Sequence, residues 1–177
     1  MKFWILSALI LLSGCGYQPS SYYAKRVVGE SVSTEVVVRM EDPQNTVIIK
    51  DAVDTAVITK FRTSLVPKNS AQTHLKISIG GVSFRPLRYD TNGYVITYRA
   101  AVSMRISRTT DGKISSYSTR GMYDFEIEPN AIISDQARFE AIRQGAQKAI
   151  DAFVAQVAAQ GADSNLTQAE APDAYSK

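Results

Sequence analysis

The sequence is short of several residues on which proteins often depend. Its 177 residues contain one cysteine, Cys15, and one histidine, His74. A single cysteine cannot form a disulfide within the chain, so stability must come from packing. A lone histidine has no second residue with which to build a histidine-rich metal site. The charge is balanced, with 20 lysines and arginines against 17 aspartates and glutamates, which argues against a nucleic-acid-binding protein.

The sequence also lacks a hydrophobic run long enough to span a bilayer as a helix. The apolar stretch over residues 3–12 is too short. It follows a positive residue, and the small pair Ser13-Gly14 separates it from Cys15. This order resembles a bacterial lipoprotein signal, which is cut before the cysteine. The alternative is an ordinary secretory signal with a chance cysteine at the cleavage site.

The lipoprotein interpretation predicts a signal peptide over residues 1–14 and acyl chains on Cys15, which anchor a protein essentially permanently. Gly16 follows Cys15. In enteric bacteria an aspartate at that position favours inner-membrane retention. Its absence therefore predicts the outer membrane, with the domain on the periplasmic side. We expect a lipidated tether over residues 15–31, a single α/β domain over 32–160, and a disordered tail over 161–177, which is small and polar.

Hydrophobic periodicity predicts the first three elements of the domain. A β-branched run over residues 32–40 predicts a strand. Apolar residues recur every fourth position from about residue 46 or 50 to 65, which predicts a helix. Residues 73–89 alternate as a strand, but the apolar positions shift across Gly80-Gly81 and again across Arg85-Pro86. Each shift predicts a bulge, and Pro86 predicts an edge position.

Two turns predict a three-stranded antiparallel arrangement. Asn92-Gly93 and Asp111-Gly112 are both signals for two-residue hairpin loops. With Asp111-Gly112 as the loop, Tyr98 faces Phe125 and Arg99 faces Asp124. In this register apolar residues face apolar residues, and a cation faces an anion. A shift of the strand pairing by one residue would remove both matches. The last of these strands is expected over residues 114–128.

A second helix is expected from Ser134 or Asp135 through Gln160, with Gly161 ending it. The order β-α-β-β-β-α predicts an α+β fold. It is a two-layer sandwich of a mainly antiparallel four-stranded sheet with two helices on one face. The other face is expected to be polar and open, and carries Lys76, Thr97, Arg99, Ser103, Arg105, Arg120, Asp124 and Glu126.

Catalytic signatures are absent from the sequence. It has no glycine-rich phosphate loop, no H-E-x-x-H, no G-x-S-x-G and no C-x-x-C. We interpret His74 as a surface or edge side chain, since the sequence places no carboxylate or nucleophile beside it. Glu126 and Glu128 are interpreted as a solvated face. The sequence therefore predicts a protein that is not an enzyme and uses no metal or cofactor.

Arginines on the predicted open face are the candidate ligand-binding residues. A planar guanidinium binds phosphate bidentately, and lipopolysaccharide carries such phosphates. Arg99 and Arg105 share one face of a predicted strand, and Arg120 lies on the next strand. Asp124 opposite Arg99 favours pairing over ligand binding there, whereas Arg105 faces Ser118 and is the freer candidate.

These features together resemble the LptE family of lipopolysaccharide-assembly lipoproteins. The resemblance covers about residues 15–160. It rests on Cys15-Gly16-Tyr17, an early helix around residues 54–58, three consecutive antiparallel strands and a long final helix. It implies a non-enzymatic protein that sits as a plug inside the outer-membrane β-barrel LptD and helps deliver lipopolysaccharide to the outer leaflet. Only the lipidated Cys15 carries over from the family as a site residue.

Two other classes of protein remain open at this point. One is an auxiliary lipoprotein of an ABC-type lipid transporter, or a periplasmic activator of a cell-wall synthase. The other is a small periplasmic enzyme, which would need a deep pocket with clustered titratable groups.

Overall fold

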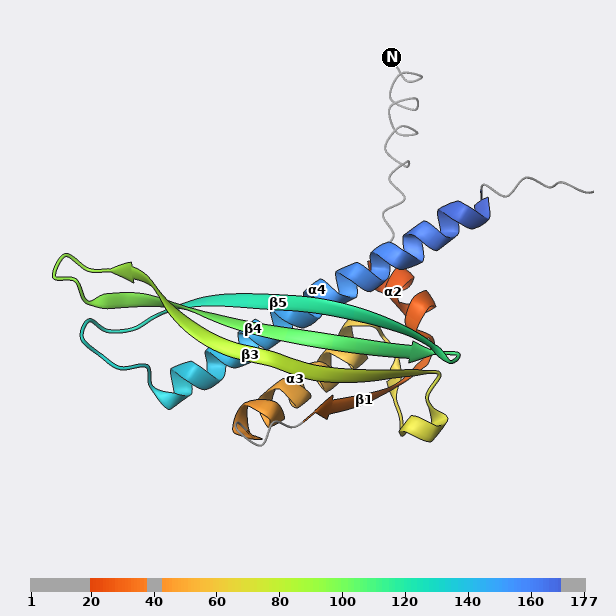
Figure 1. Cartoon of the computed structure of the whole chain (residues 1–177), viewed down its shortest axis with the longest axis horizontal. Helices are drawn as coiled ribbons and strands as arrows, with labels where there is room; N and C mark the ends of the chain where they lie inside the picture. Colours follow the sequence, from red (N-terminus) through yellow and green to blue (C-terminus); the bar gives the residue numbers. More distant parts are fainter. Residues whose placement is uncertain (1–19, 38–42, 170–177) are drawn as a thin grey trace, which may run out of the picture.

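A five-stranded mixed sheet with helices against one face forms the molecule (Figure 1). The computed structural model describes residues 20–37 and 43–169. The predicted signal peptide, Cys15 and residues 170–177 of the predicted tail lie outside the described residues. In chain order the elements are α2 (Ser20–Val28), β1 (Ser31–Val37), α3 (Pro43–Lys60), β2 (Ser64–Leu65), the 3-10 helix η2 (Lys68–Ser70), β3 (Thr73–Tyr89), β4 (Val95–Thr110), β5 (Lys113–Glu126) and α4 (Asp135–Ala169).

The sheet differs from the predicted one in the number and direction of its strands. Its order is β2-β1-β3-β4-β5. β1 runs parallel to both β2 and β3, while β3, β4 and β5 are antiparallel. The expected α+β class is confirmed, but the sheet has five strands and is mixed, and the described chain has three α-helices. The pairing of β1 with β3 is parallel because the chain passes from one to the other through the crossover helix α3, as parallel strands require.

The first helix occupies part of the predicted tether. Within α2, Ala24 and Val28 are fully buried. The helix ends at Gly29, which has a φ of +86° and donates its backbone N–H to the Lys25 carbonyl at 2.7 Å. The stretch before residue 32 is rich in glycine, serine and tyrosine, and a short amphipathic helix in it was not expected. The folded part of the chain therefore begins no later than residue 20.

The α3 helix forms as predicted, with different ends. Its apolar stripe of Ile49, Val53, Val57 and Phe61 is buried. The helix starts at Pro43, earlier than expected, and stops at Lys60, where Arg62 takes a φ of +54°. Ser64–Leu65, expected inside this helix, instead form β2 beside β1.

The long helix α4 begins as predicted and continues past its predicted end. The Ser134 hydroxyl accepts the Ala137 backbone N–H at 3.2 Å, as an N-cap does. The helix runs through Gly161 to Ala169. A Cβ on Gly161 would lie 2.6 Å from the Tyr23 carbonyl oxygen of α2. Gly161 therefore permits a close helix–helix approach, and it does not end the helix.

The antiparallel half of the sheet has the predicted register. Thr110 pairs with Lys113, Tyr98 with Phe125 and Arg99 with Asp124. Both residues of the Asp111-Gly112 turn have positive φ, at +50° and +74°, as this type of two-residue loop requires. The match of apolar and charged pairs across the two strands is confirmed.

The β3–β4 hairpin confirms the two predicted irregularities and corrects its loop. The register shifts after Ile79 and after Pro86, as predicted, and a third shift between Arg88 and Tyr89 was not predicted. Pro86 lies beyond Ser78, the last β3 residue that pairs with the described part of β1. The loop has three residues rather than two, because Asp90 donates its N–H to the Tyr94 carbonyl at 2.8 Å and Gly93 takes the left-handed conformation with a φ of +84°.

The core lies between the sheet and the two long helices. Val102, Met104 and Ile106 of β4 are buried against them. α4 crosses β5 where Gly121 meets Gly145, so closely that a Cβ on Gly121 would clash with the Gly145 carbonyl oxygen. Tyr117 and Phe153 make an edge-to-face contact with centroids 5.0 Å apart. The helices cover one face of the sheet and leave the other to the polar side chains described below.

Candidate functional site

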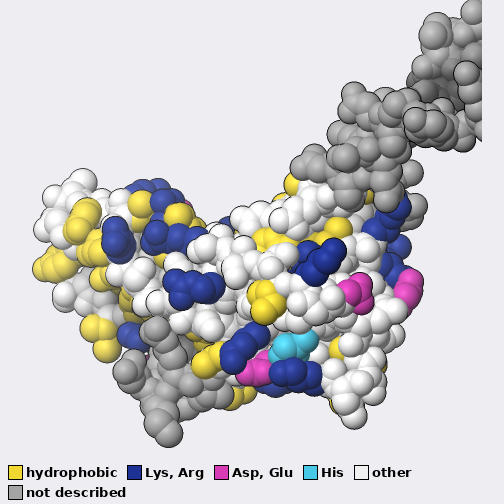
Figure 2. Space-filling view, turned by 45° about the vertical axis from the view of Figure 1, so that its right-hand side comes forward, with side chains coloured by type: hydrophobic (Ala, Val, Ile, Leu, Met, Phe, Trp, Pro, Cys, Tyr) yellow, Lys and Arg dark blue, Asp and Glu magenta, His cyan; other side chains and the backbone are white. Residues whose placement is uncertain are grey.

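The open face is the face of the sheet turned away from α3 and α4. Strand alternation sends Glu35 of β1, the even residues of β5 and the odd residues of β4 to this side. Lysine and arginine side chains are spread across it, around a single histidine (Figure 2). Its charged residues are Glu35, His74, Lys76, Arg85, Arg88, Arg99, Arg105, Arg120, Asp124 and Glu126.

Arg99 is paired within the sheet, as its register predicts. Its Nε and Nη2 donate to the two carboxylate oxygens of Asp124 at 2.7 and 2.8 Å. This bidentate contact lowers the pKa of Asp124 and raises the pKa of Arg99. Both side chains are 41% exposed, so the pair stabilises the sheet only slightly. The main role of Arg99 is therefore to pair β4 with β5, and its guanidinium is less available to a ligand.

A second ion pair on this face was not expected from the sequence. Arg88 donates through Nη2 to Glu126 at 2.8 Å and through Nε to the Thr97 hydroxyl at 3.0 Å. The extra residue in β3 at Leu87 brings Arg88 opposite Thr97. Glu126, interpreted above as simply solvated, is thus one half of a cross-strand pair.

Three arginines of the open face have no ion pair with any described residue. Arg85, Arg105 and Arg120 are exposed. In the register Arg120 faces Ser103, and Arg105 lies between Ser78 and Ser118. This agrees with the prediction that Arg105 is freer than Arg99. The three guanidiniums are available to an anionic ligand.

Arg85 was missed by the sequence analysis, although a signal for it was present. The bulge after Ile79 shifts the alternation of β3, so that Phe84 faces the core and Arg85 faces outward. Arg85 then lies opposite Arg99. The parity shift across Gly80-Gly81 predicts this placement once it is followed to the end of the strand.

A hollow adjoins one of the free arginines. It has a volume of about 320 Å³ and is lined by Val37, Ser78, Ile79, Gly80 and Arg105. It lies where β1 ends and β3 continues. Its lining includes both apolar residues and Arg105. Such a place suits a group with a charged head beside an apolar body.

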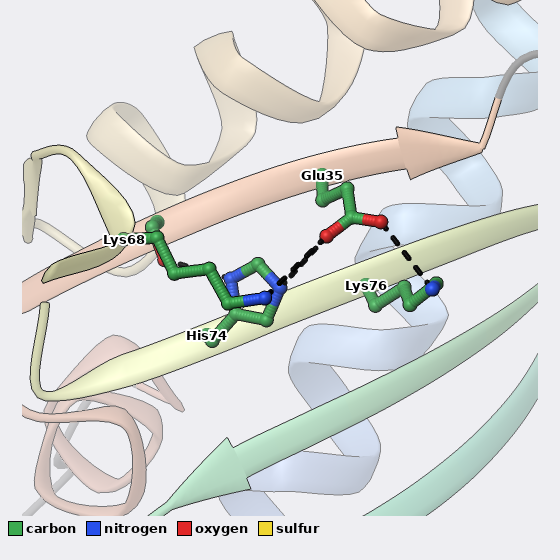
Figure 3. A network of polar contacts seen from close by, with 5 residues as sticks. Glu35, Lys68, His74 and Lys76 are labelled. Atoms are coloured by element: carbon green, nitrogen blue, oxygen red, sulfur yellow. Dashed lines mark hydrogen bonds and ion pairs between the residues drawn. The ribbon is translucent and has the colours of Figure 1, made fainter.

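A polar network joins β1 to β3 on the same face (Figure 3). The Glu35 carboxylate lies 3.2 Å from His74 Nε2, 3.3 Å from Lys76 Nζ and 3.7 Å from Lys68 Nζ. Ser33 Oγ lies 2.8 Å from His74 Nδ1. Hydrogen bonds from Lys76 and His74 lower the pKa of Glu35. The expectation that His74 has no carboxylate beside it was wrong, because it did not include the parallel pairing of β1 with β3.

The Ser33–His74–Glu35 contacts do not form a catalytic site. Ser33 is 4% exposed, so a substrate cannot reach its hydroxyl. The serine contacts Nδ1 and the carboxylate contacts Nε2, the reverse of the contacts in a serine–histidine–acid triad. The arrangement holds side chains in place and presents cations to solvent.

A hollow on the opposite side of the molecule lies between α3 and α4. It has a volume of about 710 Å³, and its charged lining residues are Asp51, Glu140 and Arg143. Gln144 and Arg143 lower the pKa of Glu140, whereas a general acid needs a raised one. No group of metal-ligating side chains occurs within residues 20–37 and 43–169, and none of the helices described there is long and apolar enough to cross a membrane.

Comparison with known proteins places these features in a family context. A family model described as LptE, lipopolysaccharide-assembly, matches residues 34–157. Among solved structures, the chain is similar to a predicted lipoprotein from Caulobacter crescentus, with 11% identity over 81% of this chain and 98% of the other and a TM-score of 0.51. This likeness concerns the fold alone.

Two further solved structures are similar at lower scores. One is an uncharacterised lipoprotein B from Nitrosomonas europaea, with 16% identity over 75% of this chain and 84% of the other and a TM-score of 0.49. The other is the rare lipoprotein B from Shewanella oneidensis, with 12% identity over 78% and 95% and a TM-score of 0.41. No curated protein matches the chain.

Proposed function

This chain belongs to the LptE family of lipopolysaccharide-assembly proteins, and from that membership we propose that it is an outer-membrane lipoprotein without enzymatic activity. Cys15 carries the lipid anchor, and the domain lies on the periplasmic side. Its partner is an outer-membrane β-barrel of the LptD type, in which it sits as a plug. The observation in this molecule that supports the ligand part of the proposal is the open face, where Arg85, Arg105 and Arg120 have no ion pair with a described residue.

The shape of the sheet supports a place inside a barrel. β3 has 17 residues, which extend to about 55 Å at a typical strand rise. The apolar band of an outer-membrane barrel is about 25 Å tall and its interior is polar. The sheet is thus long enough to run through the barrel, and its polar face suits the lumen. The helices on the other face hold the strands together without a disulfide.

The ligand in this proposal is the phosphorylated part of lipopolysaccharide. Arg105 and Arg120 are candidates, and Arg85 joins them because of its placement on the open face. Each presents a planar fork of donors that fits a phosphate. Arg99 contributes less, since Asp124 already occupies two of its three donor nitrogens, Nε and Nη2.

The test is the identity of the partner. A photo-crosslinking residue is placed at Asn92 or at Lys113, beside the two hairpin turns, and the chain is purified from membranes in mild detergent. We expect a large outer-membrane β-barrel to be captured at both positions, and samples without irradiation give the background. Recovery as a free monomer, with normal surface lipopolysaccharide after depletion, would contradict the proposal. An inner-membrane partner would favour an auxiliary transporter lipoprotein or a synthase activator instead.

A further inference from the structure

We infer that Lys68, His74 and Lys76 form a second anion-binding site on the open face, one that binds phosphate monoesters. Glu35 occupies this site as an internal counter-ion, and ligand binding displaces its carboxylate. The site is separate from Arg85, Arg105 and Arg120, and nothing in the proposed plug role requires it. The inference rests on how three cationic or polar side chains from two elements, η2 and β3, meet on the Glu35 carboxylate of β1.

The cations converge from different parts of the chain. Lys68 comes from η2, whereas His74 and Lys76 come from β3, two residues apart on one face. Their nitrogens lie 3.7, 3.2 and 3.3 Å from the oxygens of Glu35. The folded chain thus already holds one anionic group at this point. The same three donors are placed for the oxygens of another anion.

His74 is held in position for this role. Ser33 Oγ lies 2.8 Å from its Nδ1, which fixes the ring and directs Nε2 toward the Glu35 carboxylate (Figure 3). The His74 side chain is 15% exposed, whereas that of Glu35 is 43% exposed. The imidazole is therefore part of the sheet surface, while the carboxylate lies above it and can rotate into solvent.

The exposure of the partners makes displacement feasible. The side chains of Lys68 and Lys76 are 69% and 53% exposed, and exposed ion pairs contribute little individually. A phosphate monoester carries between one and two negative charges and three acceptor oxygens near neutral pH. It therefore offers one oxygen to each of the three donors, and more charge than a carboxylate does.

The surrounding charges favour an incoming anion. Arg105 lies opposite Ser78, the next outward residue of β3 after Lys76. The other acids of the open face, Asp124 and Glu126, are bound by Arg99 and Arg88. Among the described residues, Glu35 is thus the carboxylate that competes for this site.

The single histidine of the chain allows a direct measurement. The full chain in detergent is titrated with inorganic phosphate while the imidazole resonances are followed by NMR. We expect saturable shifts for Glu35→Gln at phosphate concentrations about 1.5-fold to fivefold lower than for the wild type, the factor that loss of a competing surface ion pair gives. Glu128→Gln, which removes the same charge from an exposed position, is the matched control and should titrate like the wild type.

Further variants separate the site from a general charge effect. Lys76→Gln combined with Glu35→Gln should abolish the gain in phosphate affinity that Glu35→Gln gives alone. Lys68→Gln alone should weaken phosphate binding in a chain that keeps Glu35. Vesicles containing a lipid with a phosphate-monoester headgroup, compared with free phosphate, distinguish the two sources of the ligand. Equal titrations for the wild type and Glu35→Gln, or no His74 shift with either source, would overturn the inference. Capture of the barrel by the hairpin crosslinks is independent of these results, so the two proposals can fail separately.

Discussion

The two halves of the sheet are built by different kinds of pairing. β3, β4 and β5 are joined by short hairpin turns, so each strand lies beside its neighbour in the chain. β1 reaches β3 only after α3, β2 and η2 have intervened. The hairpin half carries one-to-one ion pairs and free arginines, whereas the parallel half gathers three cations on one carboxylate. In the hairpin half, charged residues therefore meet in separate pairs. The pairing of β1 with β3, which are distant in the chain, brings several cations together around Glu35.

The largest effect is expected where the hairpin half meets α4. Gly121→Val places side-chain atoms against the Gly145 carbonyl and the Ala149 backbone nitrogen, and neither can move without displacing the helix. We expect a loss of unfolding free energy of more than about 4 kcal/mol, or failure to fold. Urea denaturation measures it. Met122→Val, at the neighbouring exposed position, should change stability by less than about 0.5 kcal/mol; a similar loss there would contradict the close approach.

A smaller loss is expected in both halves when one core side chain is shortened. Leu75→Ala, in the part of β3 that pairs with β1, removes a side chain that is 2% exposed, and should cost about 2–5 kcal/mol. Phe125→Ala, in the hairpin half, removes a half-buried ring that stacks on Tyr98 at 6.2 Å. It should cost about 2 kcal/mol, below the range for a fully buried phenylalanine. Equal losses of unfolding free energy for Leu75→Ala and Phe125→Ala would contradict the expectation that the Leu75 side chain contributes more.

A still smaller effect concerns acid stability. The pKa of Glu35 is lowered by Lys76 and then by His74, and that of Asp124 by Arg99. A lowered pKa means that the unfolded chain takes up the proton first. Each contribution to stability is therefore present above the ordinary pKa of the group, 4.5 for Glu35 and 3.8 for Asp124, and is lost as the pH falls through the lower pKa of the folded state.

Thermal unfolding between about pH 5 and about pH 3 tests this in each half. Glu35→Gln and Asp124→Asn should each flatten the fall in melting temperature relative to the wild type. Glu128→Gln should leave the fall unchanged. A wild-type profile in both variants would show that neither contact contributes to acid sensitivity.

The smallest effect on stability is expected for a free cation of the open face. Arg105→Glu breaks no ion pair with residues 20–37 or 43–169 and should change the unfolding free energy by less than about 0.5 kcal/mol. In cells, however, it should weaken lipopolysaccharide delivery and raise sensitivity to hydrophobic antibiotics. Arg143→Glu, on the helix side, is the comparison. Unchanged sensitivity with Arg105→Glu would count against a functional role for this face.

The outcome of the sequence predictions follows the same division. The β4–β5 register, both bulges in β3, the stripe of α3 and the Ser134 cap could all be predicted, because each depends on residues close together in the chain. The C-terminal end of α4 and the start of the folded chain could not be predicted. Gly161 is an ordinary stop signal unless the α2 backbone lies against it, and α2 itself is stabilised by contacts with α4.

The sequence by itself determined the strand alternation and the pairing of β4 with β5, because hydrophobic period and turn chemistry are local properties. Its match to a family model separately identified the family. Only the tertiary structure decided which charges meet. Glu35 is 33 residues from Lys68 and 39 from His74 in the chain, and no local pattern relates them. Their contact depends on parallel pairing of β1 with β3, whose register is set by the burial of Val32, Leu75 and Ile77 in the shared core. The packing of apolar side chains in the core thus determines which polar side chains meet on the open face.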